Sequence, residues 1–389
     1  MTANFKVFRH LFEAEQMYSA HMNRNEGALA PEEAVCARLF EFAQEYRAAV
    51  PRRAPVHPLI LRAAARLSSS GFLRRDGRLQ SLANTTSIFH MTHIAKTGGR
   101  SVKVELNRLV KPVGGAEQCH APFVHESRVS VIFFREPRSH VLSQYLHSAY
   151  AGRASNRREM GLPVVPGNDV EGFGKWVRHF ADDWSPAKGD FGGYNPMNMM
   201  ARVLTCRDEH WNCDYLKGCD APCAHHVGRR KEDAFPPLGA AVAAVHMADV
   251  VGVLELLPEV ICVLEYRRLG KMSHGCVCNP ARKDAGGEST PQHARRAHVM
   301  NSRRQRAARK VSLAEVPPET ISRLDSITKV DAQVYRAAVV RVLCDIQAVE
   351  RATGNKVLCS PRMEQVRNLS FHIPNLWRTF SSYSLPRWL

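Results

Sequence analysis

The sequence contains no long apolar run and few acidic residues for its number of basic ones. No stretch reaches the roughly 18 consecutive apolar residues of a membrane-spanning helix, so we expect no transmembrane segment. Residues 1–30 also lack the apolar core of a signal peptide. Asp and Glu number 37 against 54 Lys and Arg, a net charge of +17. This charge suits an anionic cofactor or an acidic glycan, and it leaves nucleic acid open as a partner.

The sequence also lacks the phosphate loop of nucleotide triphosphatases, G-x-x-x-x-G-K-[ST], in which a lysine follows the second glycine. Residues 87–109 contain a different glycine loop. Four apolar residues, Ile88, Phe89, Met91 and Ile94, predict a short buried strand. The glycines at 98–99 allow a tight turn, and residues 102–109 carry apolar side chains at helical spacing. This order predicts a strand, a turn and a helix.

The start of that helix is a predicted anion site. The first N–H groups of a helix have no partner within the helix, and they carry a partial positive charge. Lys96 and Arg100 add full positive charges at the same place. The loop therefore predicts binding of a phosphate or a sulfate, although an exposed lysine beside a structural glycine turn is an alternative interpretation.

A second stretch predicts another anion contact. Apart from Ser130, residues 129–134 are β-branched or aromatic, which indicates a buried strand, and Arg135-Glu-Pro137 follows it. Pro137 suits the first turn of a helix that would carry Ser143 two turns further on. An arginine at the end of a strand offers a fork of donors to a phosphate, and Ser143 adds a hydroxyl. A structural salt bridge of Arg135 and a plain surface position of Ser143 are the alternatives.

Together these stretches resemble a known family. The order H-I-x-K-T-G-G-x-S, with Lys96 ahead of the two glycines, resembles the 5′-phosphosulfate loop of sulfotransferases that use 3′-phosphoadenosine 5′-phosphosulfate (PAPS). Arg135 and Ser143 fit R-x-P-x5-S, the pattern of the 3′-phosphate site of the same family, about 40 residues further on. Looser likenesses across residues 86–350 resemble Golgi-type carbohydrate sulfotransferases, and most closely an algal or protist sulfotransferase-like group.

The resemblance implies a fold and a reaction. The implied fold is α/β, with a central parallel sheet flanked by helices, similar to the P-loop nucleotide hydrolases. The implied enzyme transfers a sulfuryl group from PAPS to an acceptor hydroxyl, with a carbohydrate as the default acceptor, an anionic one included. A small alcohol or a phenol is the other acceptor class. No metal is required, and no nucleic-acid partner is expected.

The resemblance also assigns roles to residues. Lys96 would neutralise charge on the leaving phosphate oxygen. A base from segment 111–126, which is rich in glycine and proline and predicted to be a loop, would take the acceptor proton; His120 is the first candidate and His125 the second. His140 stands where many members carry a basic residue, so a neutral His140 would weaken the grip on the 3′-phosphate. The predicted cofactor-binding residues are Lys96, Thr97, Gly98, Gly99, Arg100, Ser101, Arg135 and Ser143.

The 11 cysteines are more than a cytosolic enzyme usually has. Four of them lie within residues 206–223, near the histidines at 225 and 226, and Cys276 and Cys278 form a second pair. Disulfides and a zinc site are the two interpretations, and the spacings match no common zinc motif, which favours disulfides. Cysteine content and the resemblance favour the Golgi lumen, although Golgi sulfotransferases usually have an N-terminal anchor. A soluble protein, an incomplete gene model and an unusual targeting route are the alternatives.

The rest of the chain is organised around residues 86–350, the predicted sulfotransferase domain. Residues 1–85 are predicted to be a helical extension, residues 206–226 a cysteine-rich insertion, and residues 351–389 a tail. Asn198 and Arg202, four residues apart, would contact acceptor or phosphate, or would instead cap and brace a helix. Basic residues of a later polar stretch would close over the adenine and the 3′-phosphate, with Arg295, Arg296 and Arg303 as candidates.

Two rival functions remain at this stage. The first is a kinase or a nucleotide hydrolase, which would need magnesium and a carboxylate at the end of a strand. The second is a non-enzymatic basic protein that binds nucleic acid or acidic glycans through its arginine-rich runs, and its binding would depend steeply on salt. The acceptor, the oligomeric state, the disulfide pairing and the compartment stay open.

Overall fold

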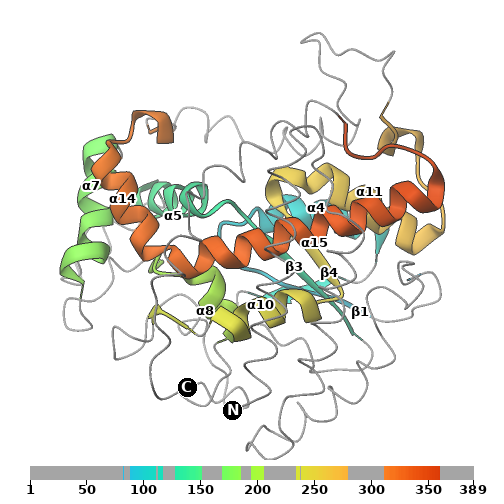
Figure 1. Cartoon of the computed structure of the whole chain (residues 1–389), viewed down its shortest axis with the longest axis horizontal. Coiled ribbons are helices and arrows are strands. Elements are labelled where there is room, and N and C mark those ends of the chain that lie inside the picture. Colours follow the sequence, from blue (N-terminus) through green and yellow to red (C-terminus); the bar gives the residue numbers. More distant parts are fainter. Residues whose placement is uncertain are drawn as a thin grey trace, which may run out of the picture. The chain divides into compact units, whose positions relative to one another are not determined.

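The computed structural model (Figure 1) describes residue 82 and residues 88–110, 113–116, 128–150, 169–184, 194–205, 234–236, 238–278 and 311–359. These residues belong to two compact units. The sheet unit takes its described residues from 88–261 and 311–339, and the cysteine unit takes residue 82, residues 262–278 and residues 340–359.

Four strands of the sheet unit form one parallel sheet in the order β2-β1-β3-β4 (Figure 1). Phe89 of β1 lies opposite Val113 of β2 and Val129 of β3, and Val131 of β3 lies opposite Val250 of β4. Because all the strands run in one direction, their carboxyl ends share one edge of the sheet. The predicted parallel sheet is thus confirmed. The strands are β1 (Ile88–Thr92), β2 (Val113–Ala116), β3 (Arg128–Phe134) and β4 (Val250–Val253).

Strands β3 and β4 form because their sequences are largely apolar on both faces. Residues 129–134 of β3 and all four residues of β4 are buried. Side chains of successive strand residues point to opposite faces, so a strand that is buried throughout needs cover on both sides. A continuous β-branched and aromatic run, rather than an alternating one, is the sequence that meets this requirement.

One segment differs from its prediction. Residues 113–116 lie in the stretch expected to be a loop, and they form strand β2 at the edge of the sheet. The two glycines at positions 114 and 115 have low strand propensity, which is why sequence reasoning placed a loop there. Parallel pairing with residues 89–92 of β1 supplies the backbone hydrogen bonds that override this local preference.

Helices follow three of the strands in the chain. α4 follows β1, α5 follows β3, and α11 follows β4 after the short 3₁₀ turn η4, while α10 leads into β4. Val102 and Leu106 of α4 are fully buried, as their helical spacing predicts. The bounds are α4 (Gly99–Leu109), α5 (Pro137–Tyr150), α10 (Leu238–Met247), η4 (Leu254–Leu256) and α11 (Leu257–Leu269).

A second apolar core forms where α5, α7 and α14 pack together (Figure 1). Trp176 of α7 is fully buried, and its ring centroid lies 5.8 Å from that of Tyr145 on α5 and 4.9 Å from that of Phe180. Aromatic packing of this kind fixes the far end of α5. The elements here are α7 (Val170–Arg178), the π-helical turn η1 (His179–Asp183), η6 (Leu313–Glu315) and α14 (Pro318–Ile327).

Two further helices complete the sheet unit. The short helix α8 (Met199–Thr205) is buried along its whole length, and α15 (Lys329–Thr353) begins in this unit and continues into the cysteine unit. Within the described residues, none of the helices is both long enough and apolar enough to cross a membrane.

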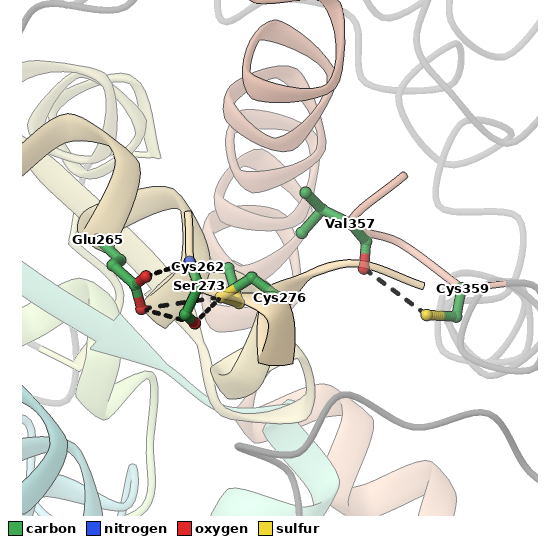
Figure 2. The surroundings of a disulfide bond; sticks show 6 residues. All are labelled: Cys262, Glu265, Ser273, Cys276, Val357 and Cys359. Carbon is green, nitrogen blue, oxygen red and sulfur yellow. Dashed lines mark hydrogen bonds between the residues drawn. A yellow bond between two sulfur atoms is a disulfide. The ribbon is translucent and has the colours of Figure 1, made fainter. Parts of the chain in front are cut away.

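Disulfides hold the cysteine unit together. Cys276 of the turn η5 (His274–Cys276) bonds to Cys262 of α11 (Figure 2). Cys278 bonds to Cys359. The carboxylate of Glu265 accepts hydrogen bonds from the backbone N–H and the hydroxyl of Ser273, as Figure 2 shows. For Cys276 and Cys278 the disulfide interpretation is therefore confirmed. The four cysteines at 206–223 lie outside the described residues.

Candidate anion-binding site

The loop after β1 has the conformation that the glycine motif predicts. Gly98 has φ +82°, in the left-handed region, and it forms the N-cap of α4. Lys96 has φ +68°, which is uncommon for a residue with a side chain. The N–H and the hydroxyl of Thr97 both donate to the carbonyl oxygen of Ile94, at 3.3 and 2.8 Å. These bonds tighten the loop and place the helix start directly at the edge of the sheet.

The N-terminus of α4 is open to an anion. No side chain caps it, and its first turn contains no acidic residue. The first N–H groups, of Gly98 to Ser101, have no partners within the helix, and the helix dipole adds partial positive charge. Lys96 lies two residues before Gly98, and the side chain of Ser101 is half-buried. The side chain of Arg100 is outside the described part.

Packing favours glycine at both positions. A Cβ atom on Gly98 would lie 2.4 Å from Cδ1 of Leu254, and one on Gly99 would lie 2.1 Å from the ring of His93. A side chain at either position would require Leu254 or His93 to move, and at Gly98 the positive φ would add backbone strain. Leu254 directly follows β4, so the ends of two strands shape the loop.

Arg135 brings the second motif to the first. It directly follows β3, the neighbour of β1, and its Nη1 donates to the carbonyl oxygen of Lys96 at 3.2 Å. The two stretches that the sequence assigned to opposite ends of one nucleotide therefore meet at one edge of the sheet. Ser143 lies two turns into α5 and is half-buried.

The N-terminus of α5, in contrast, is already occupied by a carboxylate. Glu136 precedes this helix, and its side chain accepts hydrogen bonds from the backbone N–H groups of Arg138 and Ser139 at 3.0 and 2.6 Å. A carboxylate that fills a helix start excludes a second anion there. Between α4 and α5, the start of α4 is the one suited to a phosphate or a sulfate.

His140 has a different role from the one its position in the motif suggested. It is fully buried, and its Nε2 donates to the carbonyl oxygen of Ala95 at 2.7 Å. Burial lowers the pKa of His140 to about 3, and the backbone hydrogen bond only partly opposes this, so the ring is neutral. Gln144 lies 3.3 Å from Nδ1. His140 therefore holds the glycine loop rather than adding charge to a phosphate site.

Asn198 and Arg202 brace a helix, which is the second of the two interpretations of these residues. The amide oxygen of Asn198 accepts from the N–H groups of Val330 and Asp331, and its amide nitrogen donates to the carbonyl oxygen of Ala234. Arg202 is fully buried and donates to carbonyl oxygens within its own segment, 2.6–2.8 Å away. These bonds join α8 to the start of α15.

His93 and Glu255 were missed as site residues. His93 is half-buried beside Gly99, and burial followed by the charges of Lys96 and Lys103 lowers its pKa, so the ring is neutral at neutral pH. Glu255 directly follows β4 and accepts a hydrogen bond from the backbone N–H of Glu136. The histidine at the head of the glycine motif and the acid at the end of a buried strand are the signals that could have found them.

Several predicted residues lie outside the described part of the chain. They include both candidate bases, His120 and His125, and the basic residues of the later polar stretch, Arg295, Arg296 and Arg303. Comparison of the chain with protein-family models, with curated proteins and with solved structures finds no match. The case for a function therefore depends on the chemistry of the residues at this edge of the sheet.

Proposed function

We propose that the chain is a PAPS-dependent sulfotransferase that acts on an acceptor hydroxyl, with a carbohydrate as the first acceptor class. The observation that carries the proposal is the contact between the two motifs, in which the guanidinium of Arg135 donates to the backbone of Lys96. A nucleotide with phosphate at both ends needs two cationic positions on one surface. Neighbouring parallel strands supply such positions, because their carboxyl ends meet.

The positive groups of the site support one orientation of the bound nucleotide. The open N-terminus of α4 and Lys96 suit the 5′-phosphosulfate, since backbone N–H groups and a lysine surround oxygen atoms well. Arg135 suits the 3′-phosphate, because a guanidinium offers paired donors. Thr97 already donates to Ile94, so the backbone donors that remain for the sulfuryl group belong to Gly98 to Ser101.

The proposed reaction is an in-line displacement at sulfur. The acceptor oxygen attacks the sulfur, the bond from sulfur to the 5′-phosphate oxygen breaks, and the nucleotide leaves with the electron pair. Lys96 neutralises the charge that develops on that oxygen. The acceptor proton passes to a base, for which His120 and then His125 remain the candidates. Positioning and charge stabilisation carry most of the catalysis in such transfers.

The test is transfer of labelled sulfate from PAPS to a panel of glycans and small alcohols. A Lys96→Ala variant should lose on the order of 10²-fold or more in turnover, as expected when one transition-state donor is removed. The matched control is Lys103→Ala, which removes an exposed lysine from α4. If 3′-phosphoadenosine 5′-phosphate at millimolar concentration leaves the wild-type melting temperature unchanged, and no acceptor is labelled, the proposal is wrong.

A second candidate is a kinase or a nucleotide hydrolase, because Glu136 and Glu255 stand at the ends of β3 and β4. Both carboxylates are engaged: Glu136 caps α5, and Glu255 accepts from the N–H of Glu136 and from the hydroxyl of Tyr335. This candidate requires magnesium. Activity that survives EDTA favours the sulfotransferase, and activity that EDTA abolishes favours the kinase or hydrolase.

A further inference from the structure

The end of β4 contacts both halves of the candidate site. The side chain of Leu254 packs where any Cβ on Gly98 would lie. The next residue, Glu255, accepts a hydrogen bond at 2.9 Å through Oε1 from the N–H of Glu136, the residue that follows Arg135. This one strand end therefore sets the position of the glycine loop and of the strand end that presents the arginine.

Glu255 is itself tightly held. It is half-buried, and its Oε2 accepts a hydrogen bond at 3.0 Å from the hydroxyl of Tyr335 on α15. The charged and titratable groups that face it are Arg135 and Glu136 at the end of β3 and Tyr335 on α15. A half-buried carboxylate that accepts hydrogen bonds from two other elements, with an arginine nearby, is held in a fixed position.

We propose that Glu255 is a positioning residue for the anion site, which fixes the turn that carries Arg135 and, through its negative charge, sets how tightly that site binds an anion. This inference rests on the proposed function, since it takes Arg135 as an anion ligand. The two roles of Glu255 affect anion binding in opposite directions. Its hydrogen bonds favour binding because they order the turn that carries Arg135, and its negative charge opposes binding.

The charge of Glu255 also depends on pH. Burial raises the pKa of this carboxyl, while the N–H of Glu136, the hydroxyl of Tyr335 and the charge of Arg135 act in the other direction. When the carboxyl gains a proton it loses the charge that repels the ligand. Anion affinity should therefore rise as the pH falls through the pKa that Glu255 has in the folded protein.

Two variants separate the effect of the hydrogen bonds of Glu255 from the effect of its charge. Glu255→Gln keeps an oxygen acceptor for the N–H of Glu136 and removes the charge, whereas Glu255→Leu removes the charge and both hydrogen bonds. The control for net charge alone is Glu171→Gln, because Glu171 is exposed on α7. The ligands are 3′-phosphoadenosine 5′-phosphate and inorganic sulfate, and binding to each full-length variant is measured by calorimetry from pH 4.5, the ordinary pKa of a glutamate, to pH 8.

We expect Glu255→Gln to bind both anions more tightly, by about 10-fold at pH 8, the size expected when one unit charge near a bound anion is removed in a partly buried site. Glu255→Leu should bind at least about 10-fold more weakly than Glu255→Gln, because the turn is no longer anchored. The ratio of the wild-type Kd to the Kd of Glu255→Gln cancels titration of the ligand, and it should fall toward 1 as the pH falls.

The outcomes distinguish this inference from the proposed function. If sulfate binds and the variants keep the expected order while the nucleotide does not bind, the role of Glu255 stands and the nucleotide assignment fails. If Glu255→Gln binds both anions as wild type does, or if the Kd ratio does not change with pH, Glu255 is only a structural residue and the inference is wrong. Absence of binding by either anion to any form also overturns it.

Discussion

Replacing Lys96 with glycine should raise stability while it removes activity. Lys96 combines a positive charge at the proposed sulfuryl site with φ +68°. Glycine adopts this backbone conformation without steric cost, but it has no charge to offer a leaving phosphate. Backbone strain is common at functional sites, where a residue keeps an unfavourable conformation because its side chain is needed there. Lys96 fits this pattern, since its replacement by glycine would remove both the strain and the charge.

The magnitude follows from the backbone angle. A left-handed conformation costs a residue with a Cβ about 1–2 kcal/mol. Glycine gains extra freedom in the unfolded chain, which costs about 0.5–1 kcal/mol on folding. The net gain in the free energy of unfolding for Lys96→Gly is therefore about 0.5–1 kcal/mol, or roughly 1–4 °C in melting temperature. Transfer from PAPS should fall on the order of 10²-fold or more.

Two further variants make this prediction specific. Lys96→Ala removes the charge and keeps the strain, so it should match Lys96→Gly in lost turnover and stay near wild type in stability. Asn198→Gly makes the same backbone change at φ +46°, but it loses three hydrogen bonds, and at about 1 kcal/mol each this loss should outweigh the relief. The reasoning fails if Lys96→Gly unfolds at lower denaturant than Lys96→Ala, or keeps its transfer rate.

Two other predictions concern stability. Burial raises the pKa of Asp331 to about 7, so the folded protein holds a proton that the unfolded chain releases near pH 4. This contribution to the free energy of unfolding falls as the pH rises from about 4 to about 7, while the lowered pKa of His140 acts in the opposite direction. We therefore expect the free energy of unfolding of the wild type minus that of Asp331→Asn to fall over that window, and a difference that stays flat or rises would contradict this. The bond between Cys278 and Cys359 spans 81 residues, so Cys278→Ser with Cys359→Ser should cost up to about 4.5 kcal/mol by loop-closure entropy, and an unchanged urea midpoint would refute it.

Much of the sheet could be predicted because it depends on local pattern. The apolar runs of β1 and β3 and the proline at the start of α5 act over a few residues, and the structure places these elements within two residues of their predicted positions. Strand β2 could not be predicted, because Gly114 and Gly115 carry no strand signal and only pairing with β1 makes them extended.

The parts of the site that were missed depend on contacts distant in sequence. Nothing in the motif around His140 indicates that its ring meets the carbonyl of Ala95, 45 residues earlier. The anchoring of Glu136 by Glu255 joins residues 119 apart. Asn198 is a residue type that often contacts ligands, yet its side chain forms hydrogen bonds with the start of α15 and with Ala234. The spacing of residues in the sequence predicted where the charged side chains of the site lie. Only the fold shows which residues hold the glycine loop in place.

The bond between Cys278 and Cys359 also makes the chain between them a closed covalent ring. A protease that cuts once anywhere from residue 279 to residue 358 opens this ring without releasing a fragment. The nicked protein would run as one species on a gel and separate into two pieces only after a reductant is added. An accidental cut in that region would thus remain invisible under the conditions in which purified enzymes are usually assayed.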